Sequence, residues 1–438
     1  MPLLRRRAVP QGGLPGRMSR RRATHAGAEY AMKPAVAVRW PAIAALTAVS
    51  TLAQIGQFGM GFIVLPVWLA HQGLDAQRAG FFAASQWAGM LAGLVAAPAL
   101  VARIGAKKTV LLGLATSIVA FSTIGALAWP LWIAPGVLTG LGIGLRWIAN
   151  ESWLYSLVPE ELSGRVVGVH ETLIATAGVI APALAAWCGP DGLVTILAGL
   201  SFTFAAAIPL CLTASAQPAS PVAREATPAT PVSALVCLGM IVVAVGGIID
   251  GALYGLFPLY ATARGLSGTQ ATLLLSCLGL GGMALQFPVG WMADRAGLGL
   301  AVIVCAMAST LALVTFALAT PLTWLFPASG LIVGGMNSAF ITLGMYAAAC
   351  SEKTALVRNM RLVSLAFTAS SIVGPLVAGG AMKVFGNDIL MWPLAIASGA
   401  LAVFTLGICE GRRQQVMRES HASHENLSIV QRTSLRRE

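Results

Sequence analysis

Charged residues are scarce in this chain. Asp, Glu, Lys and Arg make up 10% of its 438 residues, whereas soluble proteins average about 25%. Hydrophobic residues make up 57%, and the mean hydropathy is +0.79. This balance excludes an ordinary cytosolic enzyme, a disordered protein and a disulfide-stapled secreted domain, and it leaves an integral membrane protein.

Several motifs are also absent. No stretch matches GxxxxGK[ST], which excludes an ATP-driven pump. None of the seven cysteines forms a CxxC pair, and we expect neither a metal site nor a cofactor. The soluble segments are too short for a catalytic domain, so we expect no enzyme. The apolar runs are continuous rather than alternating, which excludes a membrane β-barrel and predicts helices.

A membrane-spanning helix needs about 20 apolar residues, and the sequence contains twelve such stretches. They cover 41–69, 80–101, 109–128, 131–158, 166–188, 193–214, 233–261, 268–292, 299–320, 322–350, 362–384 and 389–409. The sequence therefore predicts an all-α membrane protein with twelve transmembrane helices.

The net charge of +12 is interpreted as topology rather than nucleic-acid binding, because Lys and Arg collect on the cytoplasmic side of membrane proteins. If the N-terminus is cytoplasmic, 24 of the 28 Lys and Arg residues lie on that side. Arg78, Arg264 and Lys383 lie on the far side, and Arg146 is left within the membrane. The prediction is a multi-pass protein of the bacterial inner membrane, with both termini cytoplasmic.

The two halves of the chain align when one is shifted by about 192 residues. The matched positions are Gly59 and Gly251, Pro66 and Pro258, Arg103 and Arg295, and Gly105 and Gly297. We expect a basic cytoplasmic tail over 1–40, six-helix bundles over 41–214 and 233–409, a cytoplasmic linker over 215–232, and a second basic cytoplasmic tail over 410–438. Two repeats of like orientation are typical of carriers that hold the substrate between their halves.

The loop from Gly290 to Gly297 reads G-W-M-A-D-R-A-G. It resembles the G-x-x-x-D-R-x-G signature of the major facilitator superfamily, which implies the fold of that family and a cytoplasmic gate. In the matching loop of the first half, Ala102 stands where the aspartate belongs, so the gate is expected to be one-sided or altered. The residues assigned to the gate are Gly290, Asp294, Arg295, Gly297, Arg103, Gly105, Arg165, His170 and Glu171.

Two further segments resemble the same superfamily. Residues 374–380 read G-P-L-V-A-G-G, similar to a kink pattern of efflux members, and Gly374 and Pro375 mark either a kink in the eleventh helix or a small-residue packing seam. Residues 140–153, together with Arg165, are similar to the uncharacterised YcaD-like branch, which brings no settled substrate.

Ionisable residues within a membrane cost at least about 2.5 to 3.5 kcal/mol each and mark candidate functional sites. Arg146 is assigned to substrate binding or a proton relay, with a structural pairing to Glu151 as the alternative. Glu151 is either a proton carrier or an ion-pair partner of Arg165. Asp250 is the clearest proton carrier, unless it only bonds to neighbouring backbone or to Tyr254.

The remaining residues of the predicted substrate and proton pathway are uncharged. They are Gln57, Trp147, Asn150, Tyr254 and Asn337. The pair His170-Glu171 lacks the second histidine of an HExxH metal site, and it is interpreted as part of the gate rather than as a metal ligand.

These features predict a secondary transporter that moves a small organic molecule by alternating access, as proton-coupled export of an amphipathic compound. One alternative is proton-coupled uptake of a small organic anion that binds Arg146. Another is a transport-inactive sensor or lipid-interacting protein on the same fold. The expected partners are the small molecule, protons and the lipid bilayer, and the chain is expected to be a monomer.

Overall fold

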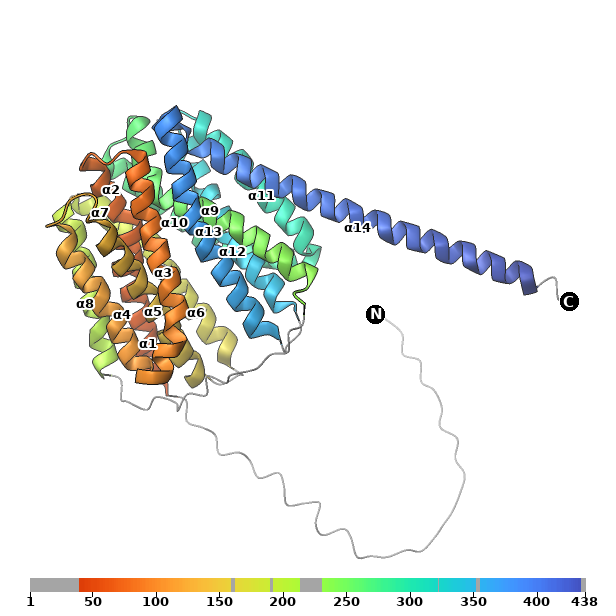
Figure 1. Ribbon diagram of the computed structural model, residues 1–438, viewed down its shortest axis with the longest axis horizontal. Coiled ribbons are helices and arrows are strands. Elements are labelled where there is room, and N and C mark those ends of the chain that lie inside the picture. Colours follow the sequence, from red (N-terminus) through yellow and green to blue (C-terminus); the bar gives the residue numbers. More distant parts are fainter. Residues whose placement is uncertain are drawn as a thin grey trace, which may run out of the picture. The chain divides into compact units, whose positions relative to one another are not determined.

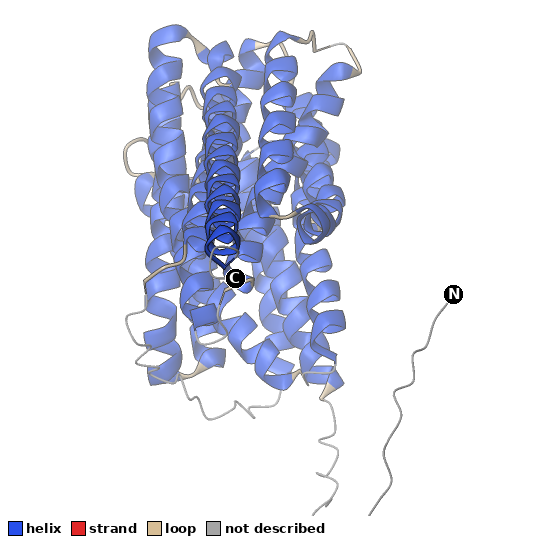
Figure 2. Ribbon diagram, turned by 90° about the vertical axis from the view of Figure 1, so that its right-hand side faces the viewer, coloured by secondary structure: helices blue, strands red, loops and turns tan. Residues whose placement is uncertain are grey.

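The computed structural model describes residues 39–158, 162–189, 192–212, 231–321, 323–351 and 355–434. Nearly all of the predicted N-terminal tail and of the linker over 215–232 lies outside the described residues. Every regular element of the described chain is a helix, as Figure 2 shows. This confirms the predicted all-α fold.

The predicted helices of the first half are all present, two of them in several pieces. In chain order they are α1 (Trp40–Ala53), η1 (Gln54–Val64), α2 (Leu65–His71), α3 (Ala76–Ile104), α4 (Ala106–Ile124), α5 (Ile133–Leu157), α6 (Ser163–Ala175), α7 (Ala177–Cys188) and α8 (Gly192–Leu212). The first three pieces form one run from Trp40 to His71, and α6 and α7 together form the predicted fifth span.

The second half repeats this plan. Its elements are α9 (Ala234–Ala263), α10 (Gly268–Ala296), α11 (Leu298–Leu318), α12 (Leu325–Ala349), α13 (Leu356–Phe385), η4 (Asn387–Ile389) and α14 (Met391–Ser434). The last helix continues well past the predicted end at residue 409 and runs out beyond the other helices in Figure 1.

Eleven helical runs of the described chain are long and apolar enough to cross a membrane. The twelfth predicted span is α5, whose 25 residues correspond to about 37 Å of helix. Its length suffices, but Arg146, Asn150 and Glu151 lower its hydropathy.

The internal repeat is visible in how two matched helices end. Gly105 caps α3 with φ 86° and Gly297 caps α10 with φ 83°, and each donates its N–H to the carbonyl four residues earlier. Glycine adopts this positive φ without steric cost. The matched glycines therefore end corresponding helices in the same way.

The two sets of six helices contact each other through α3 with α13 and through α7 with α10. Both contacts need glycine, because a Cβ on Gly80 would lie 2.4 Å from the Pro375 carbonyl oxygen. A Cβ on Gly279 would lie 2.2 Å from the carbonyl oxygen of Gly178. Backbones can therefore approach each other directly across this interface.

These contacts lie toward one end of the bundle. Lys383 Nζ donates to Gln77 Oε1 at 2.5 Å near the start of α3, and the rings of Trp87 and Phe367 meet at 5.9 Å farther along. Among the described residues other than Arg358, no hydrogen bond or ring contact joins residues 95–104 of α3 to residues 356–366 of α13. The hydrogen bond and the ring contact between α3 and α13 thus lie near Gln77 and Trp87.

Candidate functional site

A cavity of about 200 Å³ lies between the two sets of helices. The first set contributes η1, α3, α5, α6 and α7, and the second contributes α9, α10, α12 and α13. Its wall is mostly apolar. The polar side chains that line it include Gln54, Asp250, Tyr254, Gln286 and Ser338.

Aromatic rings from both halves form one side of this cavity. Phe58 of η1 meets Tyr254 of α9 edge to face, with ring centroids 6.1 Å apart. Trp87 packs edge to face against Phe58 at 6.4 Å and against Phe367 at 5.9 Å. Such a surface suits an apolar or amphipathic molecule, because aromatic rings offer a large area with few polar atoms.

Asp250 is the carboxylate that lines this cavity, and it is only 7% exposed. Asn337 of α12 donates a hydrogen bond from Nδ2 to Asp250 Oδ1. The partner of the carboxylate is therefore neither neighbouring backbone nor Tyr254, although Tyr254 also lines the cavity. The Oδ1 atom of Asn337 is buried and has no hydrogen-bond partner in the described chain.

Arg146 is buried in the first half, with 1% of its surface exposed. Its Nε donates to Gln57 Oε1 at 3.0 Å, and a terminal nitrogen donates to Gln54 Oε1 at 2.7 Å. Gln57 in turn donates to Ser117 Oγ at 2.7 Å. The guanidinium thus binds two amides rather than Glu151, and Gln54 connects it to the cavity wall.

Both of these amides come from a π-helical segment, η1. Such segments are rare, and they are frequently found at functional sites. A Cβ on Gly59 of this segment would lie 2.4 Å from Ala181 Cβ on α7. Glycine therefore lets the widened turn pack closely while it presents Gln54 and Gln57 to Arg146.

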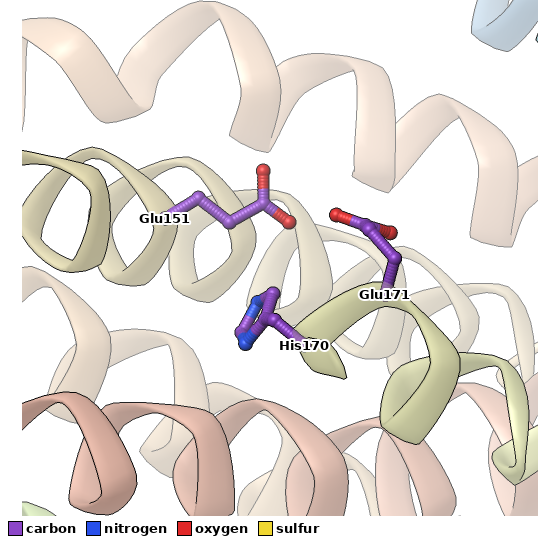
Figure 3. A group of neighbouring side chains, drawn as sticks. All are labelled: Glu151, His170 and Glu171. Carbon is purple, nitrogen blue, oxygen red and sulfur yellow. The ribbon is translucent and has the colours of Figure 1, made fainter. Parts of the chain in front are cut away.

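Glu151, His170 and Glu171 come together where α5 approaches α6, as Figure 3 shows. One ligand atom from each lies within 4.8 Å of the others. Trp147 donates from Nε1 to Glu151, and the Tyr155 hydroxyl donates to Glu171 Oε1 at 3.2 Å. Sequence analysis had assigned Glu151 to the pathway and His170-Glu171 to the gate, and the fold joins them in one cluster.

Asn150 binds a neighbouring helix instead of facing the cavity. Its Nδ2 donates to Leu46 O at 2.9 Å and to Ser50 Oγ at 2.7 Å, both on α1. The side chain is completely buried. It therefore attaches α5 to α1 and is absent from the cavity lining.

The residues predicted to form the gate do not form ion pairs with one another in the described chain. Arg103, Arg165, Asp294 and Arg295 are all exposed, and Arg295 lies 4.1 Å above the ring of Trp291 on its own helix. Gly290 has only a distant neighbour, 3.9 Å from where its Cβ would lie. The latch therefore stays a prediction.

Gly374 and Pro375 lie within the continuous helix α13. A Cβ on Gly374 would lie 2.1 Å from Ile248 O on α9, and the Pro375 carbonyl contacts α3 at Gly80. The segment thus packs closely against α9 on one side and against α3 on the other, as a small-residue packing seam does. The alternative, a kink in α13 at these residues, stays a prediction.

Sequence reasoning missed the aromatic members Phe58, Trp87 and Phe367. The position of Trp87 could have been recognised from the sequence. It lies well inside its predicted helix, whereas tryptophan in membrane proteins is enriched at the two interfaces. No comparable signal marks Phe58 and Phe367, because phenylalanine is common throughout membrane helices.

A two-part helical membrane bundle with a central cavity is the architecture of an alternating-access carrier. The sequence model described as Major Facilitator Superfamily matches residues 46–350 and 239–437. The chain belongs to this superfamily, as the loop signature indicated. It is a multi-pass membrane protein, consistent with the bacterial inner membrane.

The chain is similar to relatives that are themselves uncharacterised. It is 25% identical over 343 residues to the uncharacterised MFS-type transporter Ent638_1421 of Enterobacter sp. strain 638, covering 76% of this chain and 87% of that protein. It is 24% identical over 347 residues, with the same coverage, to the uncharacterised MFS-type transporter YcaD of Escherichia fergusonii. The resemblance to the YcaD-like branch is thereby confirmed.

Solved structures show the same fold. The nucleoside transporter NupG superposes with a TM-score of 0.67 at 13% identity, covering 84% of this chain and 98% of that chain. A D-xylose-proton symporter superposes with a TM-score of 0.65 at 12% identity, covering 84% and 97%. At these identities the likeness concerns the fold, and the twelve-helix prediction is confirmed at that level.

Proposed function

We propose that this chain is a proton-coupled secondary transporter that exports a small amphipathic molecule by alternating access. The observation that supports the proposal is the central cavity, which Asp250 lines together with aromatic rings from both halves. An apolar wall binds the hydrophobic part of a substrate, and a single carboxylate can couple binding to protonation.

Asp250 and Asn337 provide a two-state switch for this coupling. An ionised carboxylate accepts from Asn337 Nδ2, and this hydrogen bond is present between the two residues. A protonated carboxyl carries its own donor, and rotation of the Asn337 amide would then present Oδ1, which has no partner in the described chain. Each protonation state thus has its own hydrogen-bond arrangement.

The contacts between the halves support an inward-facing conformation. They lie toward the end near Gln77 and Lys383, which we expect to face the outside of the cell because most Lys and Arg residues lie toward the other side. Loss of these contacts, together with pairing of the exposed Asp294 with residues of the first half, would open the cavity to the outside. The proposed transport cycle alternates between these two arrangements.

Anion uptake through Arg146 is less favoured by the geometry. The guanidinium is buried and already donates to Gln54 and Gln57, and Arg146 does not line the cavity. Its charge is therefore better suited to balancing charge near the cavity than to holding an anionic substrate directly.

Counterflow and gradient-driven flux in proteoliposomes test the proposal, with labelled tetraphenylphosphonium and a labelled neutral amphipathic dye as probes. Wild-type protein should concentrate a probe against its gradient only when a pH gradient is imposed. Asp250→Asn should lose this uphill transport. Asp388→Asn is the matched control, because Asp388 is exposed and outside the cavity.

Uphill transport by Asp250→Asn at the wild-type rate would show that another residue couples the proton. Glu151→Gln would then be tested in the same assay. Uptake of an externally added labelled organic anion that Arg146→Ala abolishes would establish the alternative direction and substrate class.

A further inference from the structure

The cluster of Glu151, His170 and Glu171 offers three ligand atoms of a kind that binds metal ions. One carboxylate oxygen from each glutamate and one histidine nitrogen lie within 4.8 Å of one another. Figure 3 shows the two carboxylates turned toward each other, with the imidazole beside them. Two acidic groups this close repel each other when both are ionised, and a bound cation would remove that repulsion.

His170 supplies the independent observation. The side chain is completely buried, and its Nε2 atom has no hydrogen-bond partner in the described chain. Its Nδ1 atom lies 3.2 Å from Thr47 Oγ1 on α1. Contact with Thr47 fixes the ring and leaves Nε2 as the nitrogen available to a ligand. Buried polar atoms without partners are rare because each costs free energy.

We propose that Glu151, His170 and Glu171 form a binding site for a divalent transition-metal cation. Mixed imidazole and carboxylate ligands suit Zn²⁺, Mn²⁺, Fe²⁺ and Co²⁺, whereas Ca²⁺ and Mg²⁺ prefer oxygen ligands alone. Ligands at about 2.0 to 2.2 Å from one such ion lie at most about 4.4 Å apart. Small rotations of the two glutamate side chains therefore suffice to close the site.

Each proposed ligand already has a partner that orients it. Trp147 Nε1 donates to Glu151, the Tyr155 hydroxyl donates to Glu171, and Thr47 contacts His170. Such outer contacts hold ligands in place at metal sites. The three side chains are thus held by partners outside the cluster, as the ligands of metal sites are.

A bound ion would connect two helices. Glu151 lies on α5 and the other two ligands lie on α6, which is separated from α7 at Thr176. The ion would hold the first part of the predicted fifth span against α5. None of the three ligands lines the central cavity, so the metal site goes beyond the proposed transport function and does not depend on it.

Equilibrium binding of Co²⁺ to purified full-length protein in detergent tests the site. The protein is freed of metal by EDTA and carries no histidine tag. Co²⁺ binding is followed by the visible absorption of the bound ion, and Zn²⁺ is then added as a competitor. Wild-type protein should bind one Co²⁺ that Zn²⁺ displaces.

His170→Gln and Glu171→Gln should each weaken Co²⁺ binding at least tenfold, since even outer-shell changes cost about 10- to 100-fold. Glu171 is exposed, so its variant tests the site even if His170→Gln fails to fold. His71→Gln and Glu410→Gln are the matched controls, because both side chains are exposed and outside the cluster. They should bind Co²⁺ as wild type does.

Equal binding by all five proteins would place the ion elsewhere and overturn the proposal, and so would the absence of binding to wild type. The measurement needs neither substrate nor gradient. Its failure would therefore leave the proton-coupled transport proposal untouched, and failure of Asp250→Asn to affect transport would leave the metal site untouched.

Discussion

The contact between Gln57 and Arg146 gives the sharpest prediction about stability. Gln57 is completely buried, accepts from Arg146 Nε at 3.0 Å, and donates to Ser117 Oγ at 2.7 Å and to Gly113 O at 3.2 Å. Gln57→Leu preserves most of the side-chain volume but removes all three bonds. The charged guanidinium then loses one of its two amide partners.

The magnitude follows from these bonds. A hydrogen bond to a charged group contributes about 1.5 to 3 kcal/mol, whereas uncharged interhelical bonds in membrane proteins average about 0.6 kcal/mol. Ser117 Oγ keeps its own bond to Gly113 O at 3.3 Å, which limits the loss on that side. Gln57→Leu should therefore destabilise the fold by about 2 to 3.5 kcal/mol.

Reversible unfolding in mixed micelles titrated with dodecyl sulfate, followed by tryptophan fluorescence, measures this loss. Gln72→Leu is the matched control, because the Gln72 side chain is exposed and has no hydrogen bond in the described chain. It should change the unfolding free energy by no more than about 0.5 kcal/mol.

A double-mutant cycle with Arg146→Met separates the pair from its surroundings. The double variant should lose at least about 1.5 kcal/mol less than the two single variants added together. Additive losses, or a loss with Gln57→Leu no larger than with Gln72→Leu, would refute the assignment of Gln57 as the anchor of Arg146.

The remaining predictions concern glycines and use thermal unfolding in detergent as the measurement. Gly140→Ala should destabilise by about 1 to 3 kcal/mol, because its Cβ would lie 1.8 Å from Gln86 O. At Gly380 no atom lies within 4 Å of an added Cβ, so Gly380→Ala should be neutral or stabilising by up to about 1 kcal/mol. Equal effects of Gly140→Ala and Gly380→Ala would contradict the packing argument. Gly297→Ala should cost about 1 to 2 kcal/mol because its φ is 83°, whereas Gly168→Ala, in open space within α6, should not destabilise.

The sequence by itself determined the class of protein and the plan of its fold. Lipid cannot satisfy backbone polar groups, so long apolar runs must become helices, and counting those runs gave the twelve spans. Glycines at matched positions such as Gly105 and Gly297 revealed the repeat. A helix end with a positive φ requires glycine at that one position, so the requirement is visible in the sequence. The G-W-M-A-D-R-A-G loop identified the superfamily because all residues of this signature are neighbours in the sequence.

Sequence also indicated which residues to examine, because an ionisable group in a membrane is costly. It named Arg146, Glu151 and Asp250 from their positions within apolar runs. It also named Gln57 and Asn337, but it did not pair them with Arg146 and Asp250, because the partners are 89 and 87 residues apart in the sequence.

Only the tertiary structure decided which of these side chains meet. Close helix packing at Gly113 and Gly142, where a Cβ would lie 2.6 and 2.4 Å from the opposing carbonyl oxygen, sets the register between α4 and α5. Approach of α5 to α6 joins Glu151 to His170 and Glu171. Such pairings depend on how whole helices cross and rotate against each other, which many side chains determine together. The hydropathy of a single helix does not predict these crossings.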